Sequence, residues 1–357
     1  MLNKDNSHNQ LKISKNSNFV EKIIVVDGMI GGGKSLISSI ISSLPKVEMW
    51  LHKPKLEQIC SLNYLNHITL NAAKSLINTW VNEEAYNLSI SRNTNFRPSD
   101  ISSVFQTNSP FRYFKRLFKN RLDAVENIKK NPLILNLMTH VNTSYANPFF
   151  EALGDKLLYI RVCRHPMSEY MIKHNENWIN RWNKDERNGY ILYQTFSGNQ
   201  YSTHIPFFAR KIESSYLNSN STEKAILLFD QWIREGNNFI DRISKTTNAT
   251  IIEIPYEKFV FEPKLYVDKI ASSLGVFPDN KTAKELRKQG VPRDSLTDAP
   301  KSRNFKEFGW KPPKQKVSLA ENFNQGRSYV AKFANQDILK LLDKLSEDYI
   351  SRFDLKN

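Results

Sequence analysis

The chain has 357 residues, a hydrophobic content of 40% and a formal net charge of +15 at neutral pH. These fractions are those of an ordinary globular protein. Cys60 and Cys163 are too few and too far apart for a disulfide framework or a zinc site, so we expect no structural metal. No stretch reaches about 18 uninterrupted apolar residues, and the polar N-terminus, residues 1–20, lacks the apolar core of a signal peptide. We therefore expect a disordered N-terminal segment on a cytoplasmic protein without a transmembrane segment.

The positive charge is spread along the whole chain and favours anionic partners. The sequence contains no zinc-finger spacing, no RNP-like aromatic motif and no recognisable helix-turn-helix, so no specific nucleic-acid motif is present. A nucleotide cosubstrate, together with an anionic or polyhydroxylated acceptor, accounts for the charge equally well.

The most informative segment is KIIVVDGMIGGGKSL, residues 22–36. A run of β-branched residues ends in a glycine-rich turn, and the apolar periodicity of a helix follows. The spacing fits G-x-x-x-x-G-K-[ST], in which backbone N–H groups converge on phosphate oxygens and a lysine adds positive charge at a helix N-terminus. The predicted phosphate ligands are Gly28, Gly31, Gly32, Gly33, Lys34 and Ser35.

The remaining patterns predict an α/β P-loop fold of three layers, with a central parallel sheet in a single domain over residues 21–357. Further strands are expected at 46–50, 133–138, 156–162 and 250–254, a hairpin at 189–209, and helices at 35–43, 222–244, 263–274 and 335–353. Residues 54–131 read as a helical insertion that we expect to form a lid beside the nucleotide site. Residues 290–357 read as a C-terminal loop and helical cap, whose loop could close over a cofactor.

Two aromatic segments leave alternatives open. The segment SPFRYFKRLFKNR, residues 109–121, places five cations beside four aromatic rings, which indicates either a solvated helix face over an aromatic core or a contact with an anionic acceptor. The cations are Arg112, Lys115, Arg116, Lys119 and Arg121. Trp178 and Trp182 suit either core packing or a platform for a sugar ring.

The order of the motifs from about residue 22 to the C-terminus resembles that of the PAPS-dependent sulfotransferases. The loop at 28–36 lies where that family binds the 5′-phosphosulfate. The block LMTHVNTSYANPFFEALGDKLLYIRVCRHPMSEY is similar to its strand with a catalytic histidine and the later strand ending in Arg-x-Pro. The block IIEIPYEKFVFEPKLYVDKIASSLGV is similar to its late strand, Tyr-Glu element and helix ending in Leu-Gly.

The resemblance implies PAPS as cofactor, no metal, His140 as catalytic base and Arg164 as a ligand of the 3′-phosphate. It implies that Lys34 neutralises charge on the bridging oxygen.

Ser168 lies closer to Arg164 than the family's phosphate-binding serine, whose position holds Ile172. Arg287 and Lys288 resemble an Arg-Lys-Gly element, interrupted here by Gln289. Tyr256 and Glu257 match a largely structural pair, and His165 is a second candidate base that its position before Pro166 turns away.

The predicted function is transfer of a sulfuryl group to a hydroxyl or amine of a small-molecule or glycan acceptor. The alternative is an ATP- and Mg²⁺-dependent kinase of a nucleoside or other small molecule, because the loop sequence Gly-Gly-Gly-Lys-Ser is typical of enzymes that bind ATP or GTP. The strand ends MTHV and VCRHP offer histidine and arginine instead of the aspartate that would hold Mg²⁺. A non-catalytic module that binds anionic polymers is a third class, which steep salt dependence would indicate.

Overall fold

The computed structural model describes residues 19–182, 184, 193–198, 201–296 and 315–355. Almost all of the predicted disordered N-terminus, and most of the predicted closing loop after residue 290, lie outside these residues.

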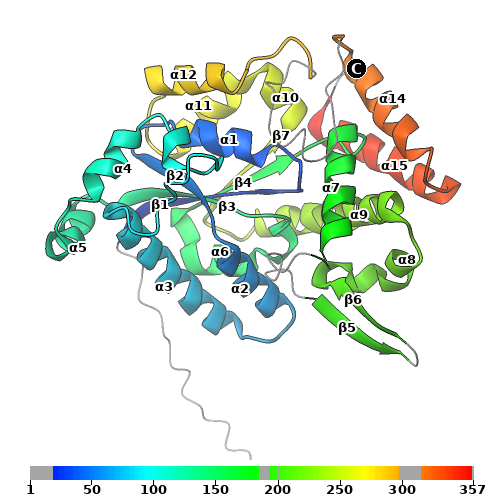
Figure 1. The fold of residues 1–357 in the computed structure, drawn as a ribbon, viewed down its shortest axis with the longest axis horizontal. Helices are drawn as coiled ribbons and strands as arrows, with labels where there is room; N and C mark the ends of the chain where they lie inside the picture. Colours follow the sequence, from blue (N-terminus) through cyan, green and yellow to red (C-terminus); the bar gives the residue numbers. More distant parts are fainter. Residues whose placement is uncertain (1–18, 183, 185–192, 199–200, 297–314, 356–357) are drawn as a thin grey trace, which may run out of the picture.

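A five-stranded, all-parallel sheet forms the centre of the molecule (Figure 1). Its order is β2-β3-β1-β4-β7. The strands are β1 (Val20–Gly28), β2 (Val47–His52), β3 (Leu133–Met138), β4 (Leu157–Cys163) and β7 (Thr250–Pro255). The glycine-rich loop follows the central strand and leads into α1 (Lys34–Ile41). The α/β prediction is confirmed.

Alternate residues of β1 enter two separate hydrophobic cores, as the two-residue repeat of a strand requires. Ile24 and Val26 belong to the core shared with α1, α10 (Tyr256–Phe261) and α11 (Pro263–Ser273). Ile23 and Val25 belong to the core shared with α3 (Leu70–Ser89), α6 (Asn147–Leu153) and α9 (Ser221–Ile243). Helices therefore cover both faces of the sheet, which gives the three layers.

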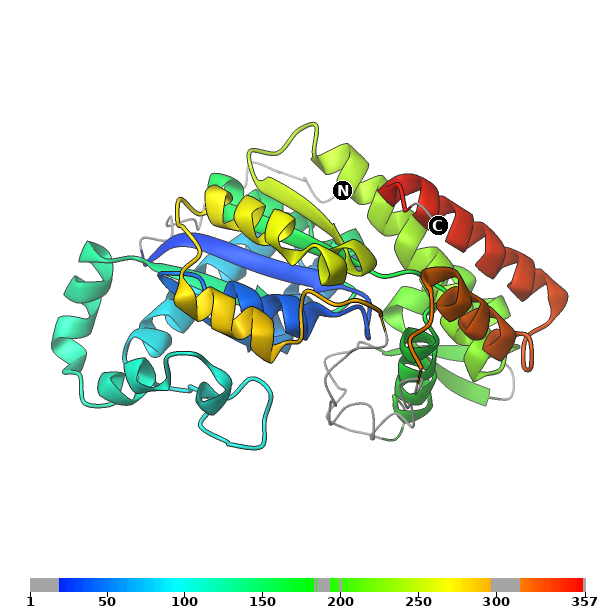
Figure 2. The same ribbon diagram turned by 90° about the horizontal axis from the view of Figure 1, so that it is seen from above.

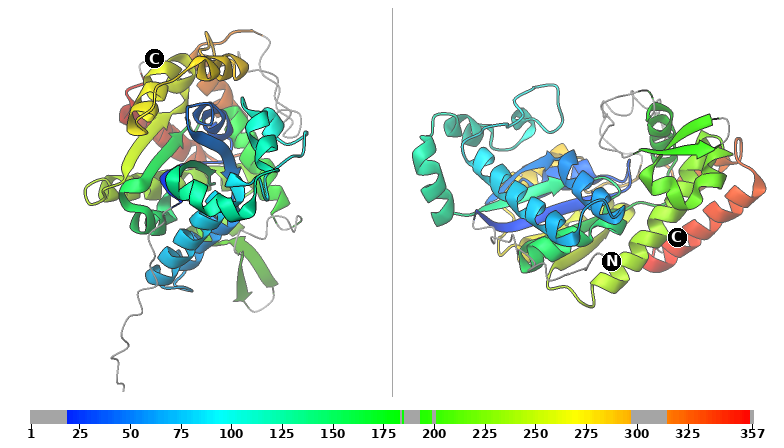
Figure 3. Two further views of the ribbon diagram at one scale, coloured as in Figure 1. Left: turned by 90° about the vertical axis from the view of Figure 1, so that its left-hand side faces the viewer. Right: turned by 90° about the horizontal axis from the view of Figure 1, so that it is seen from below.

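Only part of the helical insertion lies on the same side of the sheet as the glycine-rich loop. Its first helix, α2 (Pro54–Tyr64), starts directly after the carboxyl end of β2. Its last helix, α5 (Arg121–Lys130), ends where β3 begins, so it lies with α4 (Pro110–Arg116) near the opposite edge of the parallel sheet. Figures 2 and 3 show α4 and α5 projecting away from the sheet. α2 thus lies at the carboxyl edge and α4 and α5 do not, because the chain must return to the amino ends of the strands to begin β3. The lid role stays a prediction for α2.

The C-terminal half completes the carboxyl edge of the sheet. The predicted hairpin is present as β5 (Tyr193–Gly198) and β6 (Tyr201–Pro206). The helices of this half are α7 (Glu169–Arg181), α8 (Glu213–Leu217), α12 (Asn280–Lys288), α14 (Leu319–Val330) and α15 (Gln336–Phe353). Of these, α12 lies instead beside the end of α1, where the Thr282 hydroxyl donates to the carbonyl oxygen of Ser43. Within the described residues, no helix is long and apolar enough to cross a bilayer.

Candidate nucleotide and acceptor site

Two glycines are required by close contacts of the loop. A Cβ on Gly28 would lie 2.3 Å from the carbonyl oxygen of Val162 on the neighbouring strand. Gly33 has a φ of +99°, and a Cβ there would lie 2.4 Å from the ring of Tyr256. A side chain at either position would displace the backbone, so these glycines allow the loop to fold tightly against β4 and α10.

The backbone N–H groups of the loop and of the first turn of α1 lie at the carboxyl edge of the sheet. Gly33 precedes α1 and offers no side-chain cap, so the first-turn N–H groups remain donors for an anion. The Lys34 ammonium lies 2.8 Å from the carbonyl oxygens of both Gly28 and Met29. Burial lowers the pKa of Lys34 to about 8. The cation therefore sits inside the loop, where its charge is little screened.

His140 follows β3 and is held by a carboxylate that sequence reasoning missed. Glu57 Oε1 accepts the backbone N–H of His140 at 2.9 Å and lies 3.3 Å from His140 Nδ1 and 3.2 Å from His52 Nε2. Burial raises the pKa of Glu57, but hydrogen bonds from both imidazoles outweigh it and lower that pKa to about 2. An ionised carboxylate only accepts hydrogen bonds, so His140 carries its proton on Nδ1 and leaves Nε2 as a base.

Burial and the nearby charge of Lys34 lower the pKa of His140 to about 4. Its imidazole is therefore neutral at physiological pH, which is the state that a general base requires.

Arg164, at the end of β4, approaches the loop from the other side. Its Nη1 donates to the carbonyl oxygen of Gly31 at 2.8 Å, and its guanidinium lies 4.2 Å from the ring centre of Tyr256. Its Nε is buried with no hydrogen-bond partner. Arg293, which sequence reasoning also missed, donates to the Tyr256 hydroxyl at 3.0 Å. Tyr256 thus brings two guanidinium groups together beside Gly33, a donor set that suits a phosphate.

Other predicted ligands lie elsewhere or in packed surroundings. Lys288 donates to the carbonyl oxygen of Gln106 in the insertion at 2.5 Å, and Arg287 is exposed on α12, so neither is brought to Arg164. Ser168 precedes α7 and is 3% exposed, with no side-chain capping bond. The phosphate roles of these three residues stay predictions.

His165, which we expected its position before Pro166 to turn away, is fully buried in the core. Its ring stacks on Phe323 with centres 3.5 Å apart, and its Nδ1 accepts the N–H of Met167. Its Nε2 lies 3.1 Å from the hydroxyl of Ser346. Both ring nitrogens therefore serve packing.

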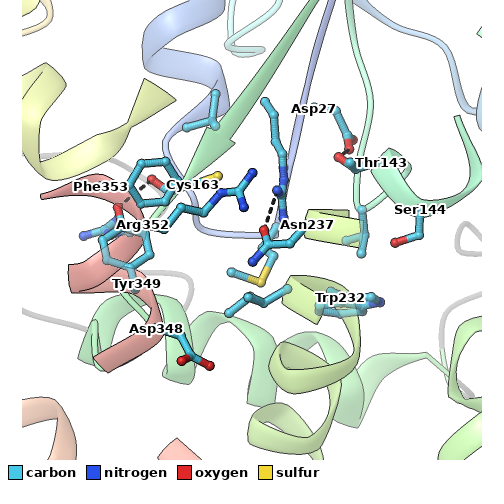
Figure 4. Close-up of a pocket in the computed structure, with 17 residues that line it drawn as sticks. Asp27, Thr143, Ser144, Cys163, Trp232, Asn237, Asp348, Tyr349, Arg352 and Phe353 are labelled. Atoms are coloured by element: carbon cyan, nitrogen blue, oxygen red, sulfur yellow. Dashed lines mark hydrogen bonds between the residues drawn. The ribbon is translucent and has the colours of Figure 1, made fainter. Parts of the chain in front are cut away.

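The prediction that the strand ends offer no carboxylate overlooks Asp27, at the end of β1. Asp27 is fully buried, and both of its oxygens are occupied. Oδ1 accepts from the Thr139 hydroxyl and the Asn142 N–H, and Oδ2 from the hydroxyls of Thr143 and Tyr159. Figure 4 shows Asp27 facing Thr143 beside a cavity that also reaches α9 and α15. The carboxylate ties strand ends together.

A separate cavity opens next to His140. It is lined by Glu57, Ser61, His140, Val141, Asn142, Tyr145, Trp178, Phe207 and Phe208. Trp178 is half-buried there, whereas Trp182 is buried in the core and packs edge-on against Trp178 and Phe208. Trp182 therefore serves core packing, whereas Trp178 lines the cavity, and its role as a platform for a sugar ring stays a prediction. The cavity sets an aromatic wall beside the candidate base.

No family model matches the chain, and no curated protein matches it. Solved structures to which it is similar are sulfotransferases, the family that the sequence motifs resemble. The sulfotransferase domain of the Synechococcus PCC 7002 olefin synthase shows 15% identity and a TM-score of 0.42, over 96% of this chain and 97% of that one. Sulfotransferase STF9 from Mycobacterium avium shows 11% and 0.42, over 94% and 78%.

Mouse sulfotransferase SULT7A1, complexed with PAP, shows 11% identity and a TM-score of 0.32, over 95% of each chain. At these identities and TM-scores, the residue roles of this chain rest on its own geometry.

Proposed function

We propose that the protein is a PAPS-dependent sulfotransferase that acts on a hydroxyl or amine of a small-molecule or glycan acceptor. The observation that carries the proposal is that, among the described residues, the hydroxyl of the loop residue Ser35 contacts a methionine, Met138, and not a carboxylate. Ser35 Oγ faces the thioether of Met138, with 3.9 Å between oxygen and sulfur, at the end of β3. A P-loop kinase needs oxygen ligands for Mg²⁺ at this place, and a thioether is a poor one. A sulfuryl group carries less charge and needs cations and N–H groups alone.

The site residues fit PAPS. The N–H groups of the loop and first turn of α1 suit the 5′-phosphosulfate, and Arg164 with Arg293 suits the 3′-phosphate. When bound, PAPS would supply the sulfuryl group and 3′,5′-ADP as its leaving group. The buried ammonium of Lys34 would stabilise the negative charge that grows on the bridging oxygen.

His140 and Glu57 prepare the acceptor. His140 Nε2 takes the proton of the attacking hydroxyl, while Glu57 holds the Nδ1–H and stabilises the imidazolium that forms. Trp178 and Phe207, on the wall of the neighbouring cavity, suit the apolar face of a ring, which supports a ring-bearing acceptor.

The kinase alternative has one specific point in its favour, the Gly-Gly-Gly-Lys-Ser loop. Its Mg²⁺ would need a carboxylate with a free oxygen near Ser35. Asp27 already accepts four hydrogen bonds, and Glu57 accepts from two histidines. Asp27 therefore has no free oxygen for a metal at the loop, while Glu57 is engaged through Oε1 with the two imidazoles.

Thermal shift with two nucleotides tests the proposal. We expect 3′,5′-ADP to raise the Tm more than 5′-ADP does, because the 3′-phosphate adds contacts with Arg164, and we expect EDTA to leave this shift unchanged. Arg164→Ala should remove the preference for 3′,5′-ADP, and Arg121→Ala, an exposed arginine on α5, is the matched control. Equal shifts, or a shift with ATP that requires Mg²⁺, would establish the kinase instead.

A further inference from the structure

The basic, aromatic segment of the insertion has two parts with different roles. Arg116 donates to both oxygens of Glu48 on β2, at 2.7 and 2.9 Å. Arg112 lies 3.5 Å from the same carboxylate and donates to the Tyr113 hydroxyl, which is buried. These arginines therefore attach α4 to the sheet and are not available to a ligand.

The other part is exposed to solvent. Within the described residues, its side chains form no ion pair or ring contact that would explain why they are basic and aromatic. We call it the α4–α5 tip, and it consists of Phe111, Lys115, Leu117, Phe118, Lys119, Arg121 and Leu122. Phe118 is 89% exposed, Leu122 84% and Phe111 77%. Scattered apolar side chains on a surface are ordinary, but four of them within twelve residues, interleaved with exposed cations, form an amphipathic surface.

The position of the tip limits what it can bind. It projects from the body of the protein beyond the amino ends of the strands (Figures 2 and 3), whereas His140 and Lys34 follow the carboxyl ends of β3 and β1. A projecting turn can insert its most exposed side chains, Phe118 and Leu122, into a lipid surface. The adjacent cations would repel a second copy of the same tip.

We propose that the α4–α5 tip docks the protein onto an anionic lipid surface. Phe118 and Leu122 enter the headgroup and acyl boundary, as exposed aromatic and aliphatic side chains do at membrane interfaces. Lys115, Lys119 and Arg121 contact anionic headgroups, and the overall charge of +15 adds long-range attraction. This docking is independent of the reaction at the nucleotide site.

Sedimentation with phosphatidylcholine vesicles, with and without phosphatidylglycerol, tests the proposal. We expect binding to the anionic vesicles alone and its loss at high salt. The double variant Phe118→Asp, Leu122→Asp should lower vesicle affinity by at least about tenfold. Lys119→Ser and Arg121→Ser should each lower it about fivefold. The matched control is Phe277→Asp, because Phe277 is 87% exposed elsewhere on the surface.

All of these side chains are exposed, so the variants should keep the wild-type Tm and nucleotide-induced shift. Equal vesicle binding by wild type and double variant, or no binding by wild type, would overturn the proposal. So would a concentration-dependent dimer that the double variant abolishes, which would make the tip an interface between copies. A failed nucleotide test leaves the lipid result unaffected, because the two readouts are separate.

Discussion

At the scale of single residues, Glu57 decides how His140 can act. One carboxylate oxygen accepts three N–H groups, from the backbone and ring of His140 and the ring of His52. This fixes the imidazole in position and in tautomer, which a lone histidine at a strand end would lack.

Substitution of the pair should separate the base from its support. If His140 is the base, His140→Ala should lower turnover by roughly two to four orders of magnitude with nucleotide affinity nearly unchanged. Glu57→Gln should cost less, because the imidazole remains. The measurements are kcat and the Kd for 3′,5′-ADP. A His140→Ala variant that loses nucleotide binding and keeps turnover would place His140 in the nucleotide site.

The pH profile gives a second readout. With a His140 pKa of about 4, wild-type turnover should fall only as the pH drops toward 4, where the imidazole gains a proton. The Glu57 charge raises the His140 pKa, so Glu57→Gln should move this acid limb to lower pH. His52→Asn is the control for the cluster, and it should move the limb the other way, because His52 lowers that pKa. An acid limb near pH 6.5 in all three proteins would contradict the assignment.

The sequence predicted the loop, His140 and Arg164 because each follows an apolar strand, and parallel strands bring their carboxyl ends to one edge. It did not predict Glu57 or Arg293. Glu57 reaches His140 across 83 residues of chain, and Arg293 reaches Tyr256 across 37. Residues so far apart in the sequence form no local motif, so these contacts become visible only in the folded chain.

At the scale of elements, the insertion is attached through a buried ionic cluster. Burial raises the pKa of Glu48, but the Arg116 hydrogen bond and the charges of both arginines outweigh it, so that pKa is lowered. The carboxylate is therefore ionised, and its partners depend on that charge. Sequence periodicity could predict the helices of this region, but not that Arg112 and Arg116 turn inward while Lys115 and Lys119 remain exposed.

Removal of this charge should destabilise the protein. Glu48→Gln leaves Arg116 buried without a counter-charge, and we expect a loss of about 3 kcal/mol in the free energy of unfolding. Because a lowered carboxyl pKa stabilises above that pKa, the difference between wild type and variant should shrink as the pH falls. Asp268→Asn breaks the exposed pair with Lys264 and should cost under about 0.5 kcal/mol. Equal losses in urea unfolding would contradict the role of the cluster.

At the scale of the whole molecule, distant segments close around one edge of the sheet. The loop, α2, α7 and α10 meet at the candidate nucleotide site, and the C-terminal helix α15 packs against the end of β4 next to it. Tyr349 of α15 places its hydroxyl 2.6 Å from Glu257 and 3.1 Å from the carbonyl oxygen of Cys163. Glu257 in turn accepts the N–H of His165, next to Arg164. The predicted amphipathic tail helix is present, but its contact with the strand end could not be predicted from periodicity.

This arrangement predicts that α15 influences the binding of 3′,5′-ADP through the turn that carries Arg164. Tyr349→Phe leaves the buried Glu257 carboxyl short of a donor, so we expect a loss of about 1–3 kcal/mol in stability and weaker binding of 3′,5′-ADP, because the turn that carries Arg164 loosens. Thermal melting and calorimetric titration measure the two effects. Tyr113→Phe is the matched control, since its buried hydroxyl also donates to a buried carboxylate, Glu48, but at the amino end of β2. If both variants lose stability and only Tyr349→Phe loses affinity, the C-terminal helix is part of the support of the nucleotide site; if affinity is unchanged in both, α15 only packs against it.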